Sequence, residues 1–133
     1  MQTLKPDYAQ AKAPGNPENF RGEAAIQNLN AGSGDELEIL AVWFKNGARN
    51  IPHVHPSDQL LVVLEGRCVV ATHDEQSILD AGQSALIRKG EWHWHGAATT
   101  QTAMHLSIKR AGTTDWKQPL HNFEAWQPKR LAG

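Results

Sequence analysis

The sequence contains a single cysteine, and this scarcity excludes several kinds of site. Cys68 alone cannot form an internal disulfide, a C-x-x-C redox pair or a zinc site built from several thiolates. It lies in the β-branched stretch GRCVV, where the side chain of Arg67 should point to the opposite face of a strand. We therefore predict a buried, unreactive thiol rather than a nucleophile.

The chain also lacks an excess of charge and any long apolar run. Its 13 Lys and Arg residues nearly balance 14 Asp and Glu residues. No phosphate-binding or polybasic face stands out, so neither nucleic acid nor a membrane is an expected partner, and a small-molecule substrate is. The start, MQTLKPDYAQ, has no apolar run of the signal-peptide type, and no later segment approaches the roughly 20 apolar residues of a membrane span. We expect a cytoplasmic protein.

Helical periodicity is scarce, whereas short alternating runs are frequent. A chain of 133 residues fits one globular domain. Residues 1–19, with three prolines, are predicted to form an N-terminal arm, and residues 20–133 the barrel domain. From residue 20 onward, runs such as AAIQNL, ELEILAVWF, QLLVVLEG, RCVVATH, SALIR and TAMHLSIKR alternate with turn signals, including the glycines at 32 and 34. This pattern predicts an all-β sandwich or barrel, with a short C-terminal segment that has room for a turn or two of helix.

Five of the seven histidines lie on three short segments that we expect to be extended. Alternate residues of a strand share a face. His53 and His55 therefore share a face in the stretch IPHVH, and His93 and His95 share one in WHWH. The other side chains that could converge on the same cavity are Gln59, which enters the next apolar run, and the alternating residues His105, Ser107 and Lys109.

Imidazoles at positions i and i+2 of a strand present two nitrogens on the same side. A third imidazole and an oxygen donor from other strands would complete a set of three nitrogens and one oxygen, with open positions for water or substrate. A polar barrel interior without metal would have to satisfy several buried imidazoles by hydrogen bonds alone. We therefore predict a site for one divalent transition metal, while His73 and His121 are predicted to be structural.

Two ordered motifs resemble those of the cupin superfamily. The first, G-x5-H-x-H-x3,4-E-x6-G, is matched by Gly47, His53, His55, Gln59 and Gly66. The second, G-x5-P-x-G-x2-H-x3-N, is matched by Gly82, Arg88, Gly90, His93 and Ala97. Gln59 replaces the usual Glu, Arg88 the usual Pro and Ala97 the usual Asn. The resemblance implies a single jelly-roll-like cupin β-barrel, a fold that hosts many activities.

A narrower resemblance covers residues 18–116. The segments GARNIPHVHPSDQLLVV, KGEWHWHGAATTQTAMHLSI and TDW look like small bacterial cupins that include manganese-dependent hydroxynitrile lyases. The resemblance implies that Mn²⁺ is held by His53, His55, Gln59 and His93. It also implies that His105 is the general base. Ligand type equally permits Fe²⁺, Ni²⁺, Co²⁺ or Zn²⁺.

The neutral amide of Gln59 favours one class of chemistry. Three imidazoles and an amide leave a divalent ion its full charge of +2, whereas a glutamate would reduce that charge to +1. The more positive centre favours Lewis-acid work on an anion or carbonyl, so a hydroxynitrile lyase-like activity is our leading hypothesis. The alternatives are a dioxygenase or isomerase of a small enolisable or phenolic compound, and a non-catalytic metal or small-molecule binder.

Other residues have two open interpretations each. His95 could orient a ligand or substrate, or could be structural. Lys109 could bind an anionic substrate, or could extend to the solvent at the rim. The resemblance places Leu40, Trp43 and Lys109 on strands that line such cavities. Trp92 and Trp94 should fill the space between the sheets or cover a subunit interface, and the five tryptophans together favour a homodimer or a higher homo-oligomer.

Overall fold

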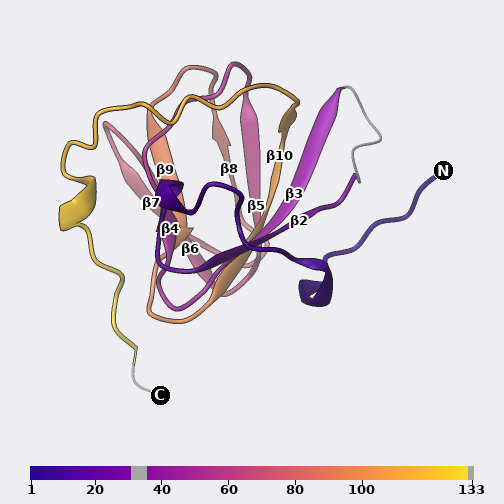
Figure 1. Cartoon of the computed structure of the whole chain (residues 1–133). Helices are drawn as coiled ribbons and strands as arrows, with labels where there is room; N and C mark the ends of the chain where they lie inside the picture. The colour runs from indigo at the N-terminus through magenta and orange to yellow at the C-terminus, as the bar shows by residue number, and fades with distance from the viewer. Residues whose placement is uncertain (31–35, 132–133) are drawn as a thin grey trace.

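Two five-stranded antiparallel sheets face each other in the computed structural model, which describes residues 1–30 and 36–131 (Figure 1). The first sheet has the order β2 (Ala24–Asn28), β3 (Leu37–Phe44), β10 (Ala103–Arg110), β5 (Gln59–Glu65) and β8 (Ser84–Ile87). The second has the order β1 (Phe20–Arg21), β4 (Arg49–Asn50), β9 (His93–Ala97), β6 (Arg67–Thr72) and β7 (Gln76–Asp80). The prediction of an all-β barrel is confirmed.

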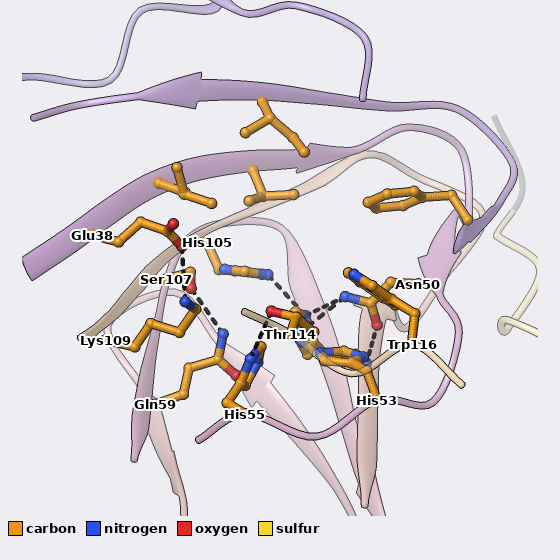
Figure 2. Close-up of a pocket in the computed structure, with 15 residues that line it drawn as sticks. Glu38, Asn50, His53, His55, Gln59, His105, Ser107, Lys109, Thr114 and Trp116 are labelled. Atoms are coloured by element: carbon orange, nitrogen blue, oxygen red, sulfur yellow. Dashed lines mark hydrogen bonds and ion pairs between the residues drawn. The ribbon is translucent and has the colours of Figure 1, made fainter. Parts of the chain in front are cut away.

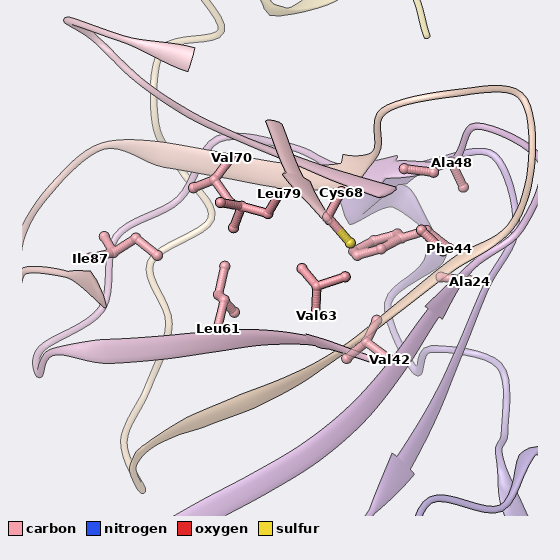
Figure 3. Packing of buried hydrophobic residues seen from close by; sticks show 12 residues of the cluster. Ala24, Val42, Phe44, Ala48, Leu61, Val63, Cys68, Val70, Leu79 and Ile87 are labelled. Atoms are coloured by element: carbon pink, nitrogen blue, oxygen red, sulfur yellow. The ribbon is translucent and has the colours of Figure 1, made fainter. Parts of the chain in front are cut away.

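The apolar core lies between the two sheets because each strand alternates its side chains. In β5, Leu61 and Val63 are buried, while Leu60 and Val62 on the outer face are half-buried. Figure 3 shows how inward residues of both sheets meet, with the thiol of Cys68 beside Phe44. Burial raises the pKa of this thiol to about 12, as expected for an unreactive cysteine.

Two strand assignments differ from the sequence predictions. The stretch IPHVH is not a regular strand; it makes two isolated bridges, one between His53 and His93 and one between Val54 and Asp115. Strand β7 was not predicted, because its sequence QSILD carries only two apolar residues. The turn expected at residues 32–34 lies outside the described residues. The expected C-terminal helical turn is a 3-10 turn, η3 (Phe123–Ala125).

The N-terminal residues reach the first sheet at two places, the edge strand β2 at Lys12 and the outer face at Tyr8. They contain two 3-10 turns, η1 (Tyr8–Gln10) and η2 (Pro17–Asn19). Lys12 and Ile26 exchange two backbone hydrogen bonds, and the ring of Tyr8 packs edge-on against Trp43 with the centroids 5.5 Å apart. Trp43 therefore faces away from the barrel interior, so the prediction that it borders a cavity is wrong. The domain boundary at residue 19 stays a prediction.

The C-terminal segment covers the outer face of the second sheet. Trp94 lies edge-on to Phe123 and Trp126, at centroid distances of 5.3 and 5.1 Å, and Trp92 belongs to the same cluster. Trp92 and Trp94 thus pack outside the sheets rather than between them. All five tryptophans are buried or half-buried within one chain, so their number no longer argues for a subunit interface. In the described part of the chain, no helix has the length and apolar character needed to cross a membrane.

Candidate metal centre and cavity

Three buried imidazoles meet at one end of the barrel. The bridge between His53 and His93 pairs their backbones, with N···O distances of 2.9 and 3.2 Å, and His55 follows two residues later. One ring nitrogen from each of the three lies within 4.8 Å of those of the other two. The structure therefore brings together residues that are about 40 positions apart, and the three histidines could hold a metal ion.

Two of these rings have their tautomer fixed by a backbone carbonyl. Nδ1 of His53 lies 2.7 Å from the oxygen of Ile51, and Nδ1 of His93 lies 2.8 Å from the oxygen of Glu91. A carbonyl only accepts hydrogen bonds, so each Nδ1 carries the proton and each Nε2 keeps a free lone pair. This is the second contact that metal-binding histidines usually make.

His55 has a buried nitrogen that no described residue satisfies. Its Nδ1 lies 3.0 Å from the hydroxyl of Thr114, whereas its Nε2 is buried without a hydrogen-bond partner. Burial lowers the pKa of His55 to about 3, so the ring is neutral at pH 7. An unpaired buried nitrogen is costly, and coordination to a metal would satisfy it.

Gln59 directs its amide oxygen at the same point. Its Nε2 donates to the hydroxyl of Ser107 at 2.8 Å, and its Oε1 lies 3.1 Å from Nε2 of His93. Burial lowers the pKa of His93 to about 4, and its one proton is already on Nδ1, so two lone pairs face each other. A cation would stabilise this arrangement. Reversing the amide would relieve the repulsion but would leave Nε2 of His55 unpaired, so the donor set fits a divalent ion better.

A second pair of imidazoles lies beside this cluster. Nδ1 of His95 is 3.1 Å from Nε2 of His105, and Asn50 accepts a hydrogen bond from the backbone N–H of His95 at 2.9 Å. The ring of Phe44 packs against both. Burial lowers the pKa of His95 well below its ordinary value and that of His105 to about 4, so both are neutral at pH 7. The pair can therefore accept a proton.

The depressed pKa of His105 predicts a loss of stability in acid. The unfolded chain binds a proton at this residue below a pH of about 6.5, whereas the folded chain resists until about pH 4. Between these values acidification favours unfolding, by up to about 1.4 kcal/mol per pH unit for one proton. We expect urea unfolding of the metal-free protein to show this loss, and the His105→Gln variant to lose less. If the unfolding free energies of the wild type and His105→Gln depended equally on pH, the prediction would be wrong.

A cavity of about 90 Å³, seen in Figure 2, is lined by His53, His55, Gln59, His95 and His105. One wall is polar, with Lys109, Ser107 and His105 along β10. The other wall is apolar and consists of Phe20, Ile26, Leu40 and Val42. Leu40 and Lys109 thus border the cavity as expected.

Four further residues complete the cavity and were not predicted. These are Glu38, Asn50, Thr114 and Trp116. The ring of Trp116 lies over His53 with the centroids 4.4 Å apart. Its segment TDW belongs to the sequence resemblance, so Trp116 could have been anticipated; Glu38, Asn50 and Thr114 carry no comparable signal.

Lys109 does not extend to the solvent, which excludes one of its two interpretations. Its side chain is only 4% exposed, and its Nζ lies 3.2 Å from Oε1 of Glu38. By contrast, His73 and His121 lie outside this cavity, where both contact the ring of Trp92.

Comparison with known proteins gives matches over most of the chain. The model of the family described as "Cupin domain" matches residues 30–109. The chain is 33% identical over 116 residues to an (R)-mandelonitrile lyase of Granulicella tundricola, covering 83% of this chain and 88% of that protein. A cupin-like protein of Thermotoga maritima superposes with a TM-score of 0.69 at 27% identity, covering 77% and 81% of the two chains. The polyketide cyclase RemF of Streptomyces resistomycificus has a TM-score of 0.74, covering 95% and 94%, but its 16% identity shows the fold alone.

Proposed function

The chain belongs to the cupin family, and on this premise we propose that it is a metal-dependent lyase that cleaves or forms a cyanohydrin-type bond at a small carbonyl compound. The observation that carries the proposal is the meeting of three buried imidazoles and the amide of Gln59 with a neutral imidazole pair beside one cavity. The mandelonitrile lyase to which the chain is similar supports the reaction class.

We propose that Nε2 of His53, His55 and His93 and Oε1 of Gln59 hold one divalent ion, Mn²⁺ as the best candidate. Such an ion supplies a Lewis acid that stabilises negative charge on a carbonyl oxygen or a small anion. The hydrogen bonds from Nδ1 of His53 and His93 to carbonyl groups keep these ligands oriented. Ser107 does the same for the amide of Gln59.

The charge of the ligand set favours lyase chemistry over oxidation. All four ligand atoms are neutral, so they leave a divalent ion its full charge. Oxygenases that use two histidines and one carboxylate reduce that charge instead. The neutral set therefore supports stabilisation of an anion or a carbonyl in this small cavity.

The imidazole pair would move the proton. In cleavage, the His95–His105 pair takes the hydroxyl proton of the cyanohydrin, the bond to the nitrile carbon breaks, and the proton passes to the departing cyanide. His95, 3.1 Å away, orients His105 and shares its proton. Asn50 fixes the backbone of His95, and Trp116 with the apolar wall limits the access of water.

The manganese-loaded protein is expected to release benzaldehyde from mandelonitrile. Replacing the general base in His105→Gln should lower the turnover rate by roughly 10²-fold to 10⁴-fold. His73→Ala, at an exposed histidine outside the cavity, is the matched control and should keep the wild-type rate. The absence of benzaldehyde above a metal-free control would contradict the proposal, and oxygen uptake by the iron-loaded form would favour an oxygenase instead.

We also propose that the chain forms a homodimer through the outer face of the first sheet. This face carries apolar side chains, with Leu64 40% and Leu86 52% exposed. The half-buried residues beside them are Ile39, Leu60, Val62, Leu106 and Ile108. A second copy would cover this surface. Sedimentation equilibrium should show twice the monomer mass, and a monomer at all concentrations would contradict the proposal.

A further inference from the structure

The ammonium group of Lys109 is buried in the cavity wall. Its side chain is 4% exposed, although a lysine is long enough to reach water from most positions. Burying a charge is costly unless the charge is paired and hydrogen-bonded. The position of Lys109 therefore needs a reason beyond packing.

The bonding of this ammonium is incomplete. An ammonium has three donors, but the described residues offer two acceptors, Oε1 of Glu38 at 3.2 Å and the backbone oxygen of Arg110 at 3.3 Å. Both distances are at or beyond the long end of the usual range. In Figure 2 Lys109 lies along the polar wall, and a dashed line marks its ion pair with Glu38. A donor thus remains for a ligand in the cavity.

Glu38 is suited to give way to such a ligand. Its side chain is 30% exposed, whereas that of Lys109 is 4% exposed, so the carboxylate is the partner that water can solvate. Strand register places Lys109 opposite Glu38 on one side and opposite Gln59 on the other. A ligand group bound to Lys109 would therefore lie close to the amide that is proposed to hold the metal.

The charges around the cavity favour an anion. Lys109 and Glu38 are the two charged side chains of its lining among the described residues, and their charges cancel. The four metal ligands are neutral, so a divalent ion would leave the cavity with two uncompensated positive charges. In a buried site, where charges are weakly screened, such an excess of positive charge is energetically unfavourable unless an anionic group balances it.

We propose that Lys109 binds a carboxylate of the substrate, so that the cavity takes a small carbonyl compound, or its cyanohydrin, that carries a carboxylate. The inference deepens the proposed lyase function and rests on it for the reacting carbonyl. The carboxylate occupies the free donor of Lys109 or replaces Glu38, which then faces water. Uncharged substrates lack this contact, so they bind more weakly.

Pyruvate and its uncharged isostere pyruvamide test the assignment by isothermal titration calorimetry of the metal-free and manganese-loaded proteins. We expect the wild type to bind pyruvate at least roughly tenfold more tightly in both forms, because a hydrogen bond to a charged group is lost with pyruvamide. In the metal-free protein, Lys109→Met should abolish this preference without changing pyruvamide binding. Glu38→Gln, which removes the competing carboxylate, should tighten pyruvate binding.

Equal affinities of the wild type for pyruvate and pyruvamide would overturn the assignment, as would an unchanged preference in Lys109→Met. If Lys109→Met does not fold, the role of Lys109 is tested by the wild-type affinities for pyruvate and pyruvamide and by the effect of Glu38→Gln on pyruvate binding. Binding to the metal-free protein requires no turnover, so it separates this inference from the lyase proposal. Pyruvate selectivity without cyanohydrin cleavage would reject the lyase alone, and cleavage without selectivity would reject the role of Lys109 alone.

Discussion

Replacing His93 by alanine is expected to empty the metal site and to abolish activity. The ring of His93 is fully buried, and its Nε2 faces both Gln59 and the two other imidazoles. Loss of a residue that merely orients a ligand costs roughly 10-fold to 100-fold in metal affinity, so loss of a ligand should cost more. Elemental analysis of purified His93→Ala should find little metal, and benzaldehyde release should fall by at least about 100-fold. Full metal content would contradict the assigned site.

The variant Gln59→Glu tests the effect of the net charge of the metal site while the metal itself stays bound. A carboxylate oxygen is also a good ligand, so this variant should retain manganese. The added negative charge lowers the formal charge of the site from +2 to +1, which should weaken its hold on a developing anion. We therefore expect a metal-loaded protein with reduced lyase activity. A variant that keeps both its metal and its full activity would show that the charge argument is wrong.

Gly96→Ala is expected to destabilise the whole barrel. A Cβ atom at Gly96 would lie 2.4 Å from Cβ of Arg49 and 2.6 Å from the backbone oxygen of Ala48. The clash is with backbone and Cβ atoms, so it can be relieved only by moving β4 away from β9, which are paired at this residue. Overpacking of this kind costs about 1–3 kcal/mol and occasionally more, and urea unfolding would measure it.

Gly15→Ala is the matched control for this change. A Cβ at Gly15 would meet nothing within 4 Å, so the substitution should leave stability close to that of the wild type. Because β9 also carries His93 and His95, Gly96→Ala should lower the metal content as well. Equal stability of the two alanine variants would contradict the close packing of β4 against β9.

The sequence by itself determined the fold class and the faces of the strands. Alternation along a strand is a local property of the backbone, so the spacing of His93 with His95, and of Leu61 with Val63, is enough to predict that the two side chains of each pair share a face. The two motifs predicted the cupin family, which the comparisons confirm. The clustering of His53, His55 and His93 also agrees with their order in those motifs.

Only the tertiary structure decided what surrounds these residues. Thr114 at His55, Trp116 over His53 and Glu38 beside Lys109 are contacts between positions far apart in the chain. They depend on which strands pair and on how the segment after β10 crosses the open end of the barrel. No local pattern encodes either.

The outer faces show the same limit. The alternation of side chains along the segment correctly placed Trp92 and Trp94 on the face opposite His93 and His95. It could not show whether that face packs against the other sheet or against the C-terminal segment. Nor could it show that Trp43 packs beneath Tyr8. A strand's alternation defines two faces; which of them becomes the interior depends on the curvature of the whole sheet and on the segments that cover it.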